Sequence, residues 1–97
     1  MNVRFLPLAS QELDDAFDWY QQQADGLGFE LLDELDRVVR RVRLFPESCA
    51  VLVDDLRRAQ LSRFPYGVIY GVEADTLVVV AVAHLHREPF YWIDRDR

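Results

Sequence analysis

The side chains best suited to chemistry gather in one short stretch near the C-terminal end of the chain. His84, His86 and Arg87 follow a long apolar run, and Tyr91 and Trp92 come soon after them. Histidine exchanges protons near neutral pH, and arginine holds phosphate oxygens with paired hydrogen bonds. Residues two apart on a strand point the same way, so the two histidines can share a site. The stretch is a candidate for acid–base or phosphate chemistry; the alternative is that these side chains cap a sheet edge.

Other chemistries have less support in the sequence. Two histidines without a convincing third ligand are a weak indication of zinc, so we predict no metal site and no cofactor. Neither Ser48 nor Ser62 has the flanking residues of a serine nucleophile. Cys49 is the only cysteine, and without a local motif it is expected to be a small buried thiol. Aromatic residues after a proline, such as Tyr91 and Trp92, either close a core or form a stacking platform.

The arginines form the second candidate feature. Residues 37–63 carry seven arginines against three acids, whereas residues 1–36 carry nine acids and one arginine. No lysine is present, so none can serve as a general base. Arg57 and Arg63 are expected on one face of a strand and Arg58 on the other. The alternative role for these arginines is solvated charge that deters sheet-to-sheet association.

Two amphipathic helices are predicted to position these residues. A short strand over Val3–Leu8 comes first, and Ser10 offers an N-cap for the helix that follows. Asp25-Gly26 ends that helix, and Gly28 helps the chain reverse. The second helix, about Phe29–Leu44, repeats the apolar stripe of the first. Two such helices joined by a short turn should form an antiparallel hairpin.

Three strands are predicted after an ambiguous connection through residues 51–55. They are Arg58–Phe64, Val68–Val72 and Leu77–Ala83, and the link of residues 73–76 is short enough for a hairpin. Leu77–Ala83 is apolar throughout, which is typical of a central strand buried on both faces. We therefore predict an α+β fold: an N-terminal strand, an antiparallel helical hairpin, then a three-stranded antiparallel meander, in one twisted sheet with the helices on one face.

Length and composition predict one small cytoplasmic domain. The 97 residues, 51% of them apolar, suit a single domain spanning 1–97. The N-terminus does not resemble a signal peptide, and the longest apolar run is too short to cross a membrane. The net charge of −6 argues against binding nucleic acid through a general positive field.

Much of the chain resembles the RelE/ParE toxins of bacterial toxin–antitoxin modules. The N-terminal residues that carry the resemblance are Leu13, Ala16, Trp19, Tyr20, Gly26, Leu27, Gly28 and Leu32. The C-terminal ones are Leu61, Arg63, Phe64, Pro65, Tyr66, Val68, Tyr70, Val72, Asp75, Val78, Val80, Ala81, Val82, His84, Arg87, Pro89 and Trp92. The resemblance implies a growth-inhibiting toxin of a type II module.

Two activities occur in this family. RelE-type members cut messenger RNA on the ribosome. By position Arg87 matches the last-strand arginine of their catalytic set and Tyr91 approximates its tyrosine, with His84 or His86 as a further acid–base candidate. Against this, Gly67 stands where these enzymes have an arginine, and Arg58 and Gln60 stand where they have lysines. ParE-type members poison DNA gyrase and lack that catalytic set. The chain resembles them more closely, which favours a gyrase inhibitor over an enzyme.

The resemblance also implies a cognate antitoxin as partner, with no sequence-specific DNA binding by this chain alone and no membrane contact. The residues expected to bind partners are Arg37, Arg40, Arg41, Arg57, Arg58, Arg63 and Trp92. Two alternatives remain open: a toxin that acts on the ribosome and messenger RNA, and a non-toxic relic that still binds its antitoxin.

Overall fold

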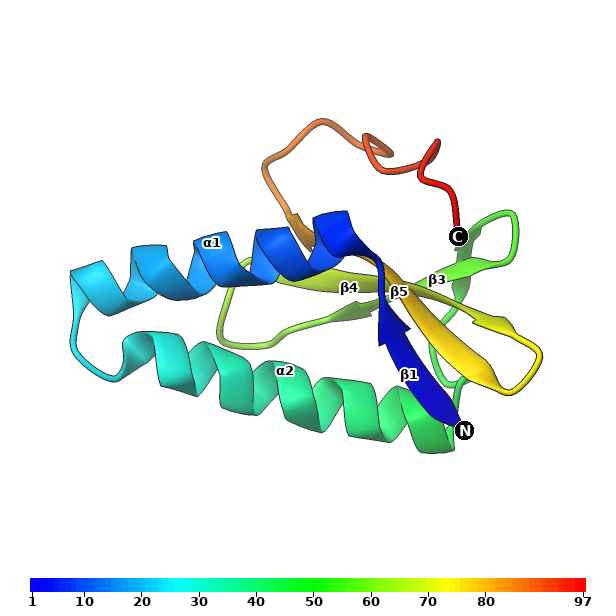
Figure 1. Ribbon diagram of the computed structural model, residues 1–97, viewed down its shortest axis with the longest axis horizontal. Helices are drawn as coiled ribbons and strands as arrows, with labels where there is room; N and C mark the ends of the chain where they lie inside the picture. The colour runs from blue at the N-terminus through cyan, green and yellow to red at the C-terminus, as the bar shows by residue number, and fades with distance from the viewer.

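One mixed sheet and a helical hairpin make up the computed structural model, which describes residues 1–97. The strands are β1 (Asn2–Phe5), β2 (Val51–Val53), β3 (Leu56–Gln60), β4 (Tyr66–Glu73) and β5 (Thr76–His84), in the spatial order β1-β5-β4-β3-β2. Strands β2 to β5 are antiparallel in succession, and β1 is parallel to β5. The helices α1 (Pro7–Gln23) and α2 (Leu27–Leu44) lie together on one side of the sheet (Figure 1). The predicted α+β architecture is confirmed.

Strand β5 is the centre of the core. It lies between β1 and β4, and each residue from Leu77 to Val82 is at most 1% exposed. A strand covered on both faces has no side that must be polar, which explains its unbroken apolar run. The predicted central strand is confirmed. Neither helix is long and apolar enough to cross a bilayer.

The first boundary differs from the prediction. Strand β1 ends at Phe5 and α1 begins at Pro7, so the strand predicted over Val3–Leu8 is too long. Proline suits the first position of a helix because its missing N–H has no partner there in any case. Leu6, in an extended conformation, is the N-cap, and its N–H donates to the Val79 carbonyl at 2.9 Å. Ser10 lies inside the helix, so its predicted role as N-cap was wrong.

The turn between the helices also differs in detail. Gly26 adopts a φ of 88°, and α2 begins directly after it, two residues earlier than predicted. Gly28 therefore lies in the helix rather than in the turn. A Cβ there would lie 2.7 Å from the Phe17 carbonyl oxygen and 2.6 Å from Gln21 Cγ. Glycine at this position lets the two helices approach closely.

The meander contains a strand that was not predicted. Val51–Val53, in the stretch that was ambiguous, forms β2 and pairs with β3 across a turn in which Asp54 has a φ of 52°. Strand β3 ends at Gln60, four residues before the predicted end. The Gln60 side-chain amide donates to the Tyr66 carbonyl at 2.6 Å, which closes the loop between β3 and β4.

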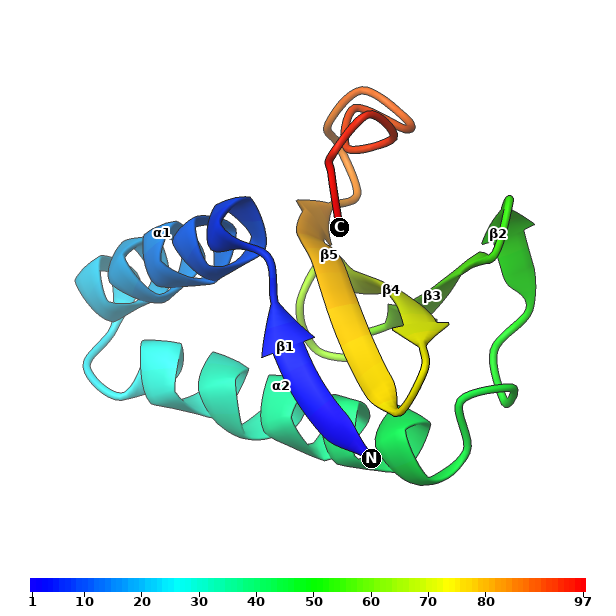
Figure 2. The same ribbon diagram turned by 45° about the vertical axis from the view of Figure 1, so that its right-hand side comes forward.

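Residues 85–97 form an irregular segment that arches away from α2 (Figures 1 and 2). It covers the sheet face on which Ile69 and Gly71 lie. A Cβ on Gly71 would overlap the guanidinium of Arg97, which also forms a bidentate ion pair with Asp55. The last residue is thus held against the sheet.

A buried carboxylate ties α2 to the loop between β3 and β4. Glu34 is 5% exposed and accepts hydrogen bonds from the backbone N–H of Ser62, from the Ser62 hydroxyl at 2.9 Å and from the N–H of Arg63 at 3.2 Å. Burial alone would raise the pKa of Glu34, but these hydrogen bonds and the charge of Arg37 outweigh it and lower the pKa. Glu34 therefore stabilises the fold in its charged form.

Replacing Glu34 with alanine should destabilise the protein by about 1–3 kcal/mol at neutral pH, because three donors lose their acceptor. The folded-state pKa is lowered, so the contribution is fully present above the unfolded-state value of about 4.3 and is lost as the pH falls through the folded-state value. Urea unfolding at several pH values measures both effects. Asp33→Ala, at an exposed neighbouring position, is the control. A Glu34→Ala loss that is the same at pH 7 and in acid would contradict the assignment.

Candidate functional site

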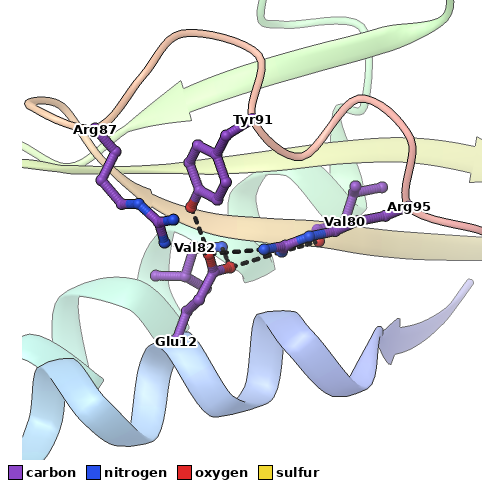
Figure 3. Close-up of polar contacts among 6 residues, drawn as sticks. All are labelled: Glu12, Val80, Val82, Arg87, Tyr91 and Arg95. Atoms are coloured by element: carbon purple, nitrogen blue, oxygen red, sulfur yellow. Dashed lines mark hydrogen bonds and ion pairs between the residues drawn. The ribbon is translucent and has the colours of Figure 1, made fainter.

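The side chain of Glu12 connects α1 to the sheet and to the C-terminal segment (Figure 3). It is 14% exposed. Its oxygens accept hydrogen bonds from the Val82 N–H at 3.0 Å, from two Arg95 nitrogens at 2.8 and 3.0 Å, and from the Tyr91 hydroxyl. A carboxylate with this many donors is strongly fixed in position.

The need for this carboxylate follows from the length of β1. The register of β1 against β5 stops at Val79, so the outer edge of β5 has no strand partner beyond it. There, Glu12 accepts the Val82 N–H, and Arg95 donates to the Val80 carbonyl at 3.0 Å. Buried backbone groups require partners. Glu12 and Arg95 replace the hydrogen bonds that a longer β1 would have supplied.

Tyr91 and Arg87 complete the cluster. The Arg87 guanidinium lies 3.8 Å from the centre of the Tyr91 ring and 3.7 Å from a Glu12 oxygen. Burial first, and then the hydrogen bond to Glu12, raise the pKa of Tyr91 to about 12. The phenol is therefore protonated at neutral pH and engaged with Glu12. Arg87, whose side chain is 57% exposed, remains accessible to a ligand.

An open groove of about 500 Å³ lies beside this cluster, between α1 and the ends of β4 and β5. Its aromatic lining consists of Trp19, Tyr20, Tyr66 and Tyr91, with His84 among them. The Tyr66 and His84 rings meet edge to face at 4.9 Å, and Trp19 is 55% exposed. The groove therefore offers apolar and aromatic surface with one available cation, Arg87.

The histidines lie together, as the sequence predicts, but one is engaged in an internal hydrogen bond. The rings of His84 and His86 are 5.2 Å apart, and Nδ1 of His84 accepts the His86 backbone N–H at 3.0 Å. Burial, and secondarily His86, lower the pKa of His84. The neutral ring then carries its proton on Nε2, so neither nitrogen is a free base. No group of three His, Cys, Asp or Glu side chains is arranged to hold a metal ion.

The arginines do not share one face of the molecule. Arg57 lies on the helix side, where it donates to the carbonyl of the partly buried Cys49. Arg58 lies on the opposite face and lines a cavity of about 110 Å³ beneath the C-terminal segment. Arg63 was predicted to share a strand face with Arg57, but β3 ends before it, and it pairs with Glu30 at 2.6 Å.

The arginines of α2 differ in their neighbours. Arg40 forms an exposed ion pair with Asp36 one turn earlier. Arg37 and Arg41 form no ion pair and line a cleft with Arg63. The expected arginine surface thus divides into this cleft and isolated positions elsewhere.

Trp92 is part of the core rather than of a binding surface. It is 3% exposed and belongs to the continuous apolar cluster. The prediction that it binds a partner is not supported, because its ring is already covered by the protein itself.

Glu12 was missed as a site residue because acids are common in the first turns of helices. The signal for it was positional. Ala9 and Ala16, three residues before and four after, are both buried, so Glu12 lies on the buried face of α1. An acid on an apolar stripe indicates a buried partner, which here is Arg95.

Glu12→Gln should destabilise the fold by about 3 kcal/mol, since it leaves the largely buried Arg95 without its counter-charge. Asp14→Asn, on the exposed side of the same helix, should change stability by less than about 0.5 kcal/mol. Urea unfolding monitored by fluorescence provides the comparison. Equal effects of the two substitutions would show that Glu12 does not hold the C-terminal segment in place.

Comparisons with known proteins agree with this architecture. The family model described as "ParE toxin of type II toxin-antitoxin system, parDE" matches residues 3–89. No curated protein matches the chain. A solved structure titled "Chromosomal ParDE TA system from P. aeruginosa" superposes with a TM-score of 0.76 at 14% identity, covering 89% of this chain and 97% of the other. At that identity the superposition shows a shared fold. From the family match over most of its length, the chain belongs to the ParE toxin family of type II toxin–antitoxin systems.

Proposed function

We propose that this chain is the toxin of a two-protein module, that a cognate antitoxin neutralises it, and that it inhibits DNA gyrase rather than cleaving messenger RNA. The observation that carries the choice of target is that Glu12, His84 and Tyr91, the candidate acid–base residues that line the groove with Arg87, are each held in an internal hydrogen bond. Cleavage of RNA by its 2′-hydroxyl needs a base, an acid and stabilisation of the charge that develops at phosphorus.

The three candidate acid–base side chains of the groove are already engaged, and the exposed His86 beside them does not line it. The Glu12 carboxylate accepts hydrogen bonds from Val82, Tyr91 and Arg95, and the Tyr91 hydroxyl donates to it. His84 accepts the His86 N–H, and burial favours its neutral form. A general base must reach the proton that it abstracts. None of these three side chains meets that requirement without breaking an internal hydrogen bond.

The surface around the groove is also poor in positive charge. The groove is lined by one arginine, Arg87, and by two acids, Glu12 and Asp15. The protein carries a net charge of −6. Because binding to RNA depends mainly on neutralising phosphates, this balance favours a protein target.

The RelE-type alternative rests on the exposure of Arg87 at the mouth of the groove. With Arg87 on phosphate, His84 Nε2–H as acid and Tyr91 for orientation, a minimal ribonuclease site can be drawn. In that case these three side chains are the catalytic residues, and the base is supplied by rearrangement of the Glu12 cluster.

Two assays on the purified protein decide between these targets. In the first, gyrase supercoils relaxed plasmid in the presence of increasing amounts of this chain, and DNA cleavage is scored on the same gels. In the second, messenger RNA from a translating extract is mapped by primer extension. We expect loss of supercoiling and intact transcripts.

Arg87→Ala and Arg43→Ala form a matched pair for the second assay, because each removes one exposed arginine and only Arg87 lines the groove. Codon-phased cuts that vanish in Arg87→Ala and persist in Arg43→Ala would overturn the gyrase assignment. If expression left growth unchanged while an adjacent-gene protein bound tightly, the chain would instead be a non-toxic relic.

A further inference from the structure

A cleft of about 260 Å³ shares no lining residue with the groove beside the Glu12 cluster. It lies between the C-terminal half of α2 and the loop that joins β3 to β4. Its lining residues are Glu34, Arg37, Val38, Arg41, Ser62 and Arg63. We call it the arginine cleft.

The cleft contains more positive than negative charge. Arg37 and Arg41 lie one turn apart on α2, about 6 Å along the axis, so their guanidinium groups flank the same opening. Neither forms an ion pair, whereas Arg40 on the same helix is paired with Asp36. Unpaired arginines at fixed spacing match a pair of carboxylates in both charge and hydrogen-bond geometry.

The acid inside the cleft forms no ion pair with these arginines, although it lies close enough to Arg37 for that charge to lower the pKa of Glu34. Glu34 directs its oxygens to the N–H and hydroxyl of Ser62 and to the N–H of Arg63. These contacts also fix the loop that forms the opposite wall. The cleft is therefore a preorganised surface, with its buried carboxylate occupied and two guanidinium groups free.

An apolar surface continues from the cleft along α2. Phe45 follows Arg41 by one turn and is 63% exposed, and Leu44 beside it is 73% exposed. An open hollow of about 530 Å³ lies there, lined by Phe45, Pro46, Glu47 and Ser48. Charge followed by apolar surface along one helix matches an amphipathic polypeptide better than a uniform chain of phosphates.

We propose that the arginine cleft binds an acidic segment of the antitoxin, with two of its carboxylates on Arg37 and Arg41 and one of its apolar side chains against Phe45. This inference rests on the proposed function, which supplies the partner. The ion pair of Glu30 with Arg63 at one end of the cleft and the exposed apolar Phe45 beyond it oppose a uniformly charged nucleic-acid backbone in the same place.

The test uses the protein encoded beside this gene as the probe, labelled and titrated against the full chain at low and moderate salt. Arg41→Glu should weaken binding by about tenfold or more and flatten the salt dependence, because it places like charges in contact. Arg43→Glu is the matched control: it makes the same charge change on the same helix, forms no ion pair and lies outside the cleft. It should leave the affinity within about twofold.

Both substitutions are at exposed positions, so unchanged urea midpoints should confirm that the variants fold. Equal affinities for Arg41→Glu and Arg43→Glu would overturn the placement of the partner while leaving the toxin function intact. In gyrase assays without antitoxin, Arg41→Glu should inhibit as well as the unsubstituted chain, which separates partner binding from toxicity.

If the adjacent protein does not bind, the proposed neutralisation fails, and the cleft is tested with synthetic probes. These are a labelled helical peptide with two glutamates one turn apart followed by leucine, the same peptide with glutamines, and a single-stranded RNA of equal length. Binding of the glutamate peptide alone, lost in Arg37→Glu/Arg41→Glu, supports the assignment. Binding of the RNA alone, or of no probe, overturns it.

Discussion

The contact between Glu12 and Arg95 is the interaction on which the arrangement of the C-terminal half depends. It joins the first helix to a residue 83 positions later and also completes the hydrogen bonding of an unpaired stretch of the central strand. Because the pair has side chains only 13% and 14% exposed, each charge relies on the other and on neighbouring donors. Tyr91 and Arg87 take their positions from this pair, and so does one wall of the aromatic groove.

The residue types that a ribonuclease would need for catalysis have a structural role in this arrangement. A carboxylate, a tyrosine and two arginines stand within reach of one another, which in isolation resembles an acid–base site. Their hydrogen bonds are mutually satisfied, however, and the tyrosine pKa is raised rather than lowered. A surface that recognises another protein needs no proton acceptor. The exposed Trp19 and Arg87 are of the residue types that most often dominate such contacts.

The sequence predicted the elements better than it predicted their contacts. The apolar run of β5 and the stripes of both helices were sufficient to identify the fold class, since periodicity depends on neighbours along the chain. The start of α1 was misplaced because Pro7 fits both a strand end and a first helical turn. The strand β2 is only three residues long, and Glu12 owes its role to a partner far along the chain. Neither the strand β2 nor the role of Glu12 can be predicted from the pattern of neighbouring residues along the chain.

The pairing of β1 with β5 bears on the order of events in the cell. Residues 2–5 pair with residues 76–79 in the sheet. The Glu12 cluster on α1 is complete only when residue 95 is in place. Contacts between residues so distant in sequence form more slowly than the contacts within local elements such as the helical hairpin. During synthesis the helical hairpin can form early, while the central strand and the aromatic groove cannot. A newly made chain therefore exposes α2 before the aromatic groove and the loop wall of the arginine cleft have formed.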